Sequence, residues 1–331
     1  MPNRYAEAHK GDNLAGPGDS RPTALQIIQD EGLTGKMTDK VFLVTGASAG
    51  IGVETARALA STGGKVFLTV RDLKKGEAAC QSFLEPNRVE LIQMDNTSLA
   101  SVRAAAETFL SKSKTLNVLV NNAGIMATPY SKTADGFESQ FATNHLAHFL
   151  LFNLLRPTLL SSSTPTFHSR VINVSSSGHM AGEVQFTSYD FSNGSTYTPW
   201  AGYGQSKTAN IYMANEIHTR YSPNGLHGIS LMPGGIWTGL QKYVSEEKMK
   251  EWKATPGVDK FMKSTEQGAA TTVLAAVGGE FEGVGRVYLE NCSVAGQTVT
   301  GMEGWVPHAF DREKEGRLWR DSLEMVGLKD E

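Results

Sequence analysis

The chain has 331 residues, with 34 glycines, two cysteines and a formal net charge of −3 at pH 7. This charge gives no electrostatic basis for binding nucleic acid, and two cysteines form neither a disulfide framework nor a metal site. No stretch approaches the ~20 apolar residues of a membrane-spanning helix, and the segment from Met1 to Arg21 lacks the apolar core of a secretion signal. The sequence therefore predicts a cytoplasmic protein without a membrane span.

The first predicted element is a short helix from Thr23 to Glu31, with Pro22 before it and Gly32 after it. We expect its apolar side chains to dock on the core of the protein, namely Leu25, Ile27 and Ile28. Residues 1–36 are interpreted as an N-terminal extension that contains this helix and precedes the main domain.

A glycine-rich turn follows an apolar strand. Val41–Thr45 is typical of a buried parallel strand, and Ile51–Ser61 is a predicted helix. The glycines between them are spaced as G-x-x-x-G-x-G, which lets the backbone approach a pyrophosphate at the free N–H groups of the helix. The alternative is a glycine-rich turn that holds no ligand. The expected cofactor contacts here are Gly46, Ser48, Gly50, Ile51 and Gly52.

The second predicted strand, Lys65–Val70, ends in Arg71. A carboxylate at this position would hold the ribose hydroxyls of NAD, whereas a guanidinium suits a 2′-phosphate. Arg71 and Lys74 therefore predict a preference for NADP(H) over NAD(H). The neighbouring Asp72 weakens this argument, and a solvated basic turn is the alternative.

Tyr203 and Lys207 lie four residues apart in a predicted helix from Gly202 to Tyr221, so their side chains share one face. An adjacent ammonium ion favours the ionised form of a phenol, so we expect Lys207 to lower the pKa of Tyr203. That shift would suit acid–base catalysis, because free tyrosine titrates about three units above neutral pH. Such a pair also occurs by chance on solvated helices, so its meaning depends on the upstream glycine turn.

With both signals in one chain, the sequence resembles the short-chain dehydrogenase/reductase family. Further motifs stand in the family's order between Val41 and Thr238, including Asn121-Asn122-Ala123-Gly124 and Pro233-Gly234. The flanking residues look most like the retinol-dehydrogenase-like and WW-domain-oxidoreductase-like branch. The resemblance implies a single Rossmann-type α/β domain, with a doubly wound parallel sheet and helices on both faces.

The resemblance also implies a catalytic tetrad of Asn144, Ser176, Tyr203 and Lys207. Tyr203 would exchange a proton with the substrate, and Ser176 would hold the substrate oxygen. Lys207 would grip the nicotinamide ribose, and Asn144 would order a water molecule that connects Lys207 to solvent.

Three serines in a row, Ser175, Ser176 and Ser177, blur the choice of the catalytic one. Counting from Asn173 in the family pattern selects Ser176. Besides Tyr203 and Lys207, the resemblance implies further cofactor contacts by Asp95, Asn96, Asn122, Ala123, Gly124, Pro233, Gly234, Ile236 and Thr238.

Residues 237–265 correspond to the variable substrate lid of the family. The candidate substrate contacts are His179, Trp237, Tyr243 and Trp252. The alternative for the aromatic residues is that they simply pack the lid. His145, His148 and His179 lie near the tetrad, but their spacing fits no metal-ligand set, so no metal site is expected.

We interpret residues 37–300 as one catalytic domain, in which Gly285–Glu290 contains the last strand. Residues 301–331 are interpreted as a helical tail packed on this domain, with a helix from Glu313 to Val326. The family often dimerises through the helices that start near Phe137 and Gly202, so a homodimer is also an expectation.

The predicted function is reversible hydride transfer between NADP(H) and an apolar alcohol, ketone or aldehyde. Two rival functions stay open at this point. The protein could bind NADP(H) for non-redox chemistry, such as a cyclisation or dehydration. It could also use the fold for binding without turnover.

Overall fold

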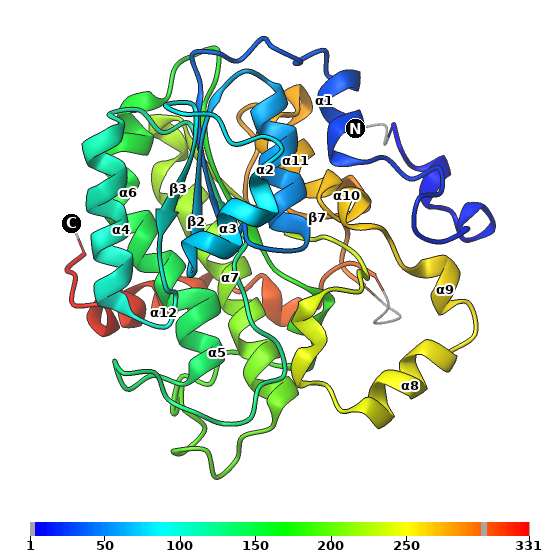
Figure 1. Cartoon of the computed structure of the whole chain (residues 1–331). Coiled ribbons are helices and arrows are strands. Elements are labelled where there is room, and N and C mark those ends of the chain that lie inside the picture. Colours follow the sequence, from blue (N-terminus) through cyan, green and yellow to red (C-terminus); the bar gives the residue numbers. More distant parts are fainter. Residues whose placement is uncertain (1–3, 299–302, 331) are drawn as a thin grey trace.

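A computed structural model describes residues 4–298 and 303–330, and the strands in these ranges form one eight-stranded sheet (Figure 1). Their order is β3-β2-β1-β4-β5-β6-β7-β8, and all neighbours are parallel except β7 and β8. The strands are β1 (Val41–Thr45), β2 (Lys65–Val70), β3 (Val89–Gln93), β4 (Val118–Asn121), β5 (Ser169–Val174), β6 (Leu226–Met232), β7 (Tyr288–Glu290) and β8 (Ser293–Val294). The predicted doubly wound α/β fold is confirmed, but β7 is not the last strand because the chain folds back into β8.

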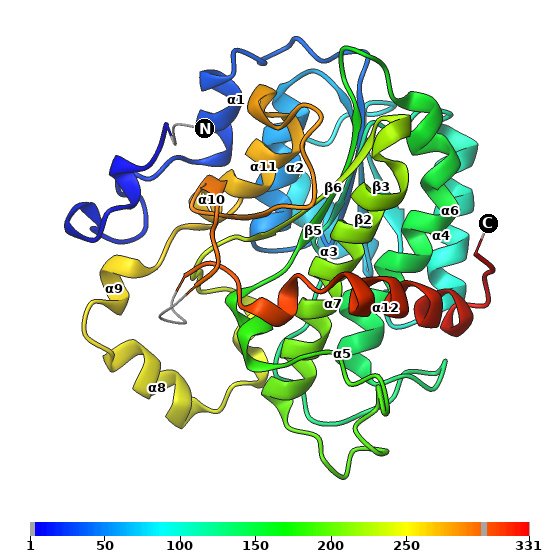
Figure 2. The same ribbon diagram turned by 180° about the vertical axis from the view of Figure 1, so that it is seen from behind.

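Helices cover both faces of the sheet (Figures 1 and 2). One face carries α1 (Ala24–Asp30), α2 (Ile51–Ser61), α3 (Leu73–Cys80), α10 (Thr265–Gly268) and α11 (Ala270–Val277). The other face carries α4 (Leu99–Lys112), α6 (Ala147–Ser162), α7 (Pro199–Tyr221) and α12 (Arg312–Met325). The remaining helices are α5 (Ser139–Phe141), α8 (Glu246–Ala254) and α9 (Val258–Phe261). The two largest apolar cores among the described residues lie one on each side of the sheet.

Local signals explain where the helices begin. Thr198 caps α7 by accepting from the backbone N–H of Ala201, and Pro199 takes the first helical position, so α7 starts before the predicted Gly202. Thr23 caps α1 in the same way. The prediction that Leu25 docks on the core is wrong, because that side of α1 faces solvent and Leu25 is 37% exposed.

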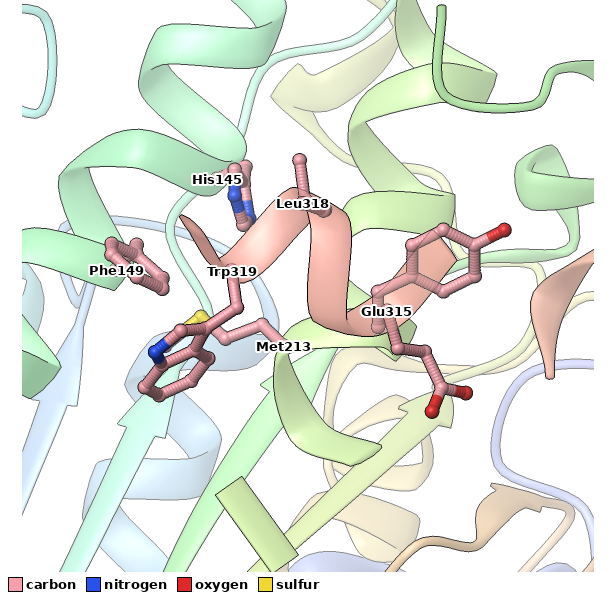
Figure 3. A pocket seen from close by; sticks show the side chains of 7 residues that line it. His145, Phe149, Met213, Glu315, Leu318 and Trp319 are labelled. Carbon is pink, nitrogen blue, oxygen red and sulfur yellow. The ribbon is translucent and has the colours of Figure 1, made fainter. Parts of the chain in front are cut away.

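The C-terminal helix α12 packs against α7 (Figure 2), and its Trp319 ring also contacts Phe149 and Phe152 of α6. The rings of Trp319 and Phe149 meet edge to face with centroids 4.9 Å apart, and the space between the helices has no room for a water molecule (Figure 3). Any homodimer through α7 would have to accommodate α12.

The predicted boundary between residues 300 and 301 lies outside the described ranges. In the part of the chain that is described, no helix has both the length and the apolarity to cross a membrane.

Candidate active site

A cavity of about 1080 Å³ opens at the carboxyl edge of the sheet, between the strand ends and helices α8 and α9. It brings together most of the predicted site residues from segments far apart in the sequence. Those that line it are Gly46, Ser48, Gly50, Ile51, Gly52, Arg71, Asp95, Asn96, Asn122, Ala123, Gly124, Ser176, Tyr203, Lys207, Pro233, Gly234, Ile236, Trp237, Thr238 and Trp252. Lys74, Asn144, His179 and Tyr243 do not belong to this lining.

The glycine turn after β1 forms one end of the cavity. Gly46 has φ +74°, and a Cβ on it would lie 2.7 Å from Cα of Ala123, so a larger residue would not fit. Gly50 precedes α2 without a side-chain cap, which leaves the first N–H groups of that helix for a ligand. Asn122 Nδ2 donates to the carbonyl of Thr45 at 2.8 Å and joins the ends of β1 and β4. These open N–H groups and the positive end of α2 fit a pyrophosphate.

Arg71 lines the cavity at the end of β2, whereas the side chain of its neighbour Asp72 binds the first turn of α3. The Asp72 side chain caps α3 by accepting from the N–H of Lys75 at 3.2 Å. The carboxylate that weakened the sequence argument is therefore directed toward a helix. Lys74 lies in the first turn of the same helix and does not reach the cavity lining.

Tyr203 and Lys207 share one buried face of α7, as their spacing predicts. Burial raises the pKa of Tyr203 to about 12, and a hydrogen bond with Ser176 opposes this rise. Burial also lowers the pKa of Lys207 to about 8. The lowered pKa of Tyr203 that the sequence predicts is therefore not found in the chain by itself, because loss of hydration is the largest influence on the phenol.

The three consecutive serines have different surroundings. Ser175 is buried and its hydroxyl donates to the backbone carbonyl of Lys207 at 2.8 Å. Ser176 and Ser177 line the cavity, and the Ser176 hydroxyl accepts from the N–H of Gly178 at 3.0 Å. Of the three, only the Ser176 hydroxyl contributes a hydrogen bond that influences the Tyr203 phenol.

Asn144 lies behind the cavity wall, in a short π-helical segment that leads into α6. Its Nδ2 donates to the carbonyl of Ile125 and to the hydroxyl of Ser206, each at 2.9 Å. Its Oδ1 accepts from the N–H of Ile125 at 2.9 Å. The side chain thus fixes the loop after β4 against α7, and its two amide hydrogens are directed to protein atoms.

His179 and Tyr243 do not occupy the substrate-contact positions expected from the sequence. His179 is buried beneath the site, and its Nδ1 lies 2.6 Å from the backbone oxygen of Ser176. Its ring packs 5.2 Å from that of Tyr288, away from the cavity. Tyr243 is 46% exposed, because the turn before α8 directs it to solvent.

Sequence reasoning missed Trp200, which lines the cavity together with Trp237 and Trp252. The Trp200 ring lies 6.2 Å from the Tyr203 ring at 86° and 5.6 Å from the Trp252 ring. Its position three residues before Tyr203 places both on the same helix face, and this spacing is the signal that could have revealed it. Met126 extends the apolar wall beside these rings.

The three histidines that lie near the tetrad in the sequence, His145, His148 and His179, are engaged with other protein atoms. His148 lies 2.9 Å from both the Thr45 hydroxyl and the Asn144 carbonyl oxygen, and it therefore links α6 to β1. Within residues 4–298 and 303–330, no group of three or more His, Cys, Asp or Glu side chains could hold a metal ion.

The doubly wound sheet, the open glycine turn and the Tyr203–Lys207 pair in one cavity define an oxidoreductase that uses a nicotinamide dinucleotide. The profile of the short chain dehydrogenase family matches residues 40–249, and the chain belongs to this short-chain dehydrogenase/reductase family.

Relatives of this chain support the assignment over nearly its whole length. The short-chain dehydrogenase/reductase prx1 of Penicillium roqueforti is 56% identical over 330 residues, which cover 99% of this chain and 96% of that protein. Retinol dehydrogenase 12 of Mus musculus is 36% identical, with 88% of this chain and 87% of that protein covered. A crystal structure of an uncharacterized protein from Mycobacterium paratuberculosis aligns with a TM-score of 0.66 and 32% identity, covering 88% of this chain and 94% of that one.

Proposed function

We propose that the protein interconverts a carbonyl and an alcohol on an apolar small molecule, with NADP(H) as cofactor and Tyr203 as the acid–base group. The observation that carries this proposal is that Tyr203, Ser176 and Lys207 line the same cavity as the glycine turn. The bound nicotinamide would supply or accept the hydride, and the protein would supply position and a proton.

The residues near the phenol have distinct roles in this proposal. During reduction, Tyr203 donates its proton to the carbonyl oxygen, and Ser176 donates a hydrogen bond to the same oxygen as negative charge develops there. Lys207 Nζ donates to the carbonyl of Val174 at 3.0 Å, and an ammonium carries three donors. Its other hydrogens are suited to the hydroxyls of a ribose. Asn144 holds this arrangement from behind.

The preference for NADP(H) rests on Arg71 at the adenosine end of the cavity. A guanidinium can bind a phosphate with two parallel hydrogen bonds. The competing carboxylate of Asp72 is engaged at α3. We propose that Asp95 and Asn96 flank the adenine, and that the backbone from Pro233 through Thr238 flanks the nicotinamide. Arg71, Asp95, Asn96 and the residues from Pro233 through Thr238 all line the cavity.

The apolar wall of the cavity supports the substrate class. Three tryptophans and Met126 line the same cavity as Tyr203. Such a surface favours an apolar substrate, because burying apolar area releases about 25 cal/mol per Å². One relative is named a retinol dehydrogenase.

Three further expectations stay predictions from the sequence. They are a cytoplasmic location, a homodimer, and the division of the chain at residues 36 and 300.

The test is to incubate the purified protein with NADPH and a panel of apolar aldehydes and ketones. We expect one alcohol to form for each NADPH oxidised. Tyr203→Phe should remove nearly all turnover and leave NADPH binding intact, whereas Tyr221→Phe, at the far end of α7, should match the parent. NADPH binding without oxidation would favour non-redox chemistry or binding alone, and an active Tyr203→Phe variant would exclude the proposed mechanism.

A further inference from the structure

The N-terminal extension lies against the substrate lid, beside α9 and α10 (Figures 1 and 2). Gln267 of α10 donates to the carbonyl of Arg21 at 3.1 Å. The contact with α9 is made by Arg21, whose side chain is only 2% exposed. Its guanidinium donates to the backbone carbonyls of Phe261 and Met262, each at 2.7 Å, and of Lys260 at 3.2 Å. One buried side chain of the extension thus holds three consecutive carbonyls of the lid.

These carbonyls lie at the C-terminal end of α9 (Val258–Phe261), where a helix leaves carbonyl groups without partners inside the helix. A cation is favoured at this end, because each carbonyl oxygen without a partner in the helix carries a partial negative charge. Arg21 therefore meets both the hydrogen-bonding and the electrostatic requirements of the end of the lid.

The guanidinium is itself fixed by an ion pair. Its Nε lies 2.8 Å from Oδ1 of Asp19, whose side chain is 3% exposed. Burial would raise the pKa of Asp19, but hydrogen bonds from Arg21 and from the N–H of Ala15 lower it to about 2. Gly16 also accepts from Arg21 at 3.2 Å, and a Cβ on Gly16 would lie 2.8 Å from the carbonyl oxygen of Asp259. The extension and the lid are thus in close backbone contact.

The strip of lid held by Arg21 is also part of the cavity wall. Phe261 and Met262 line the cavity. The next N–H, that of Lys263, donates to the carbonyl of Gly235 at 2.8 Å, and Gly235 belongs to the cavity wall that follows β6. The wall formed by Phe261 and Met262 is therefore held from outside by Arg21 and from inside by Gly235.

We infer that Arg21 is a positioning residue for the substrate. The N-terminal extension thus helps to hold the wall of the substrate site in place. This inference rests on the proposed function, since it concerns the wall against which the apolar substrate lies. Arg21 acts through Phe261 and Met262 and does not touch the cavity itself.

Two variants test this role. Arg21→Lys keeps the charge beside Asp19 but loses the planar fork that reaches three carbonyls. The double variant Asp19→Asn, Arg21→Met removes both charges, so no buried carboxylate is left unpaired. The matched control is Arg4→Met, which removes an arginine of the same extension that pairs with Glu31 away from the lid.

Each protein is assayed with NADPH and two aldehydes, propanal as a small probe and 9-anthraldehyde as a bulky apolar one. Both test variants should raise KM for 9-anthraldehyde by about ten-fold, the loss expected when a buried hydrogen bond to a charged group is removed. The kcat for propanal and the affinity for NADPH should match those of Arg4→Met. Equal losses for both aldehydes and for NADPH would reduce Arg21 to a general stability role and overturn the inference.

Backbone hydrogen exchange over residues 258–263 gives a second readout that does not depend on turnover. Faster exchange confined to this strip in both test variants is expected, and exchange equal to that of Arg4→Met would overturn the positioning role. If the unchanged protein oxidised NADPH with neither these two aldehydes nor any member of the aldehyde and ketone panel, the proposed function would fail. The exchange data would still decide whether Arg21 holds the lid.

Discussion

The ammonium of Lys207 lies 5.6 Å from the centroid of the Tyr203 ring and donates to the backbone carbonyl of Val174 at 3.0 Å. The pair is therefore adjacent, but the lysine is anchored to the end of β5. Burial has placed the pKa of Lys207 at about 8 and that of Tyr203 at about 12. As pH rises from neutral in the chain alone, the lysine loses its proton first.

We expect kcat/KM for NADPH-dependent reduction to fall as pH rises through about 8, because loss of the ammonium removes a positive charge and ribose donors from the site. The measurement is the pH–rate profile of 9-anthraldehyde reduction. Lys207→Met should lower the rate and remove this step from the profile. A parent profile that stays level well above pH 8 would contradict the assignment.

Ser176→Ala should lower kcat by about 100-fold or more, the usual effect of losing a donor to a developing oxyanion. NADPH affinity should not change. Ser175→Ala should cost about 1 kcal/mol of stability through its lost hydrogen bond, with kcat near that of the parent. Ser177→Ala is the second control. Steady-state kinetics and thermal unfolding separate these outcomes, and an inactive Ser177→Ala variant would move the role to that residue.

Arg71→Asp should weaken NADPH binding by about ten-fold or more and favour NADH, because a carboxylate repels the 2′-phosphate and can accept from ribose hydroxyls. Lys74→Asp makes the same charge change next to the cavity and should have a much smaller effect. Nicotinamide fluorescence titrations measure both. Similar losses in the two variants would mean that net charge, and not the position of Arg71, governs the preference.

Trp200→Ala should raise KM for a bulky apolar aldehyde by about ten-fold, because it removes the indole that joins Tyr203 to the lid residue Trp252. Trp200→Phe should retain most of the affinity. Tyr243→Ala changes an aromatic residue of the lid region that points to solvent, and it should behave as the parent does. Unchanged kinetics in Trp200→Ala would remove the indole from the substrate site.

Acid should destabilise the fold below the ordinary pKa of histidine. Burial lowers the pKa of His145 to about 3 and that of His148 to about 4. In the unfolded chain these histidines have the ordinary pKa of about 6.5. The unfolded chain therefore binds more protons than the native protein below about pH 6.5, down to the native pKa values of about 3 and 4. The free energy of unfolding falls as the pH falls through that window. His148 alone should account for about 1–2 kcal/mol by pH 5. Urea unfolding of the parent and of His148→Gln measures this, and equal pH slopes would contradict it.

The sequence was sufficient for the features that depend on local patterns. Val41–Thr45 and Ile51–Ser61 were placed with correct bounds, because an apolar run, a glycine turn and a helix are written in consecutive residues. The spacing of Tyr203 and Lys207 also determined their shared face, since a helix brings every fourth residue to the same side. The family motifs also placed further site residues directly after predicted strands.

Only the tertiary structure decided what surrounds these groups. Burial depends on every element that packs around a side chain, so the raised pKa of Tyr203 and the inward position of His179 could not be read from neighbours in sequence. The contact of Arg21 with the lid joins residues about 240 positions apart. Local sequence rules describe turns of a helix and the alternation of a strand, whereas contacts at that separation exist only once the chain has folded.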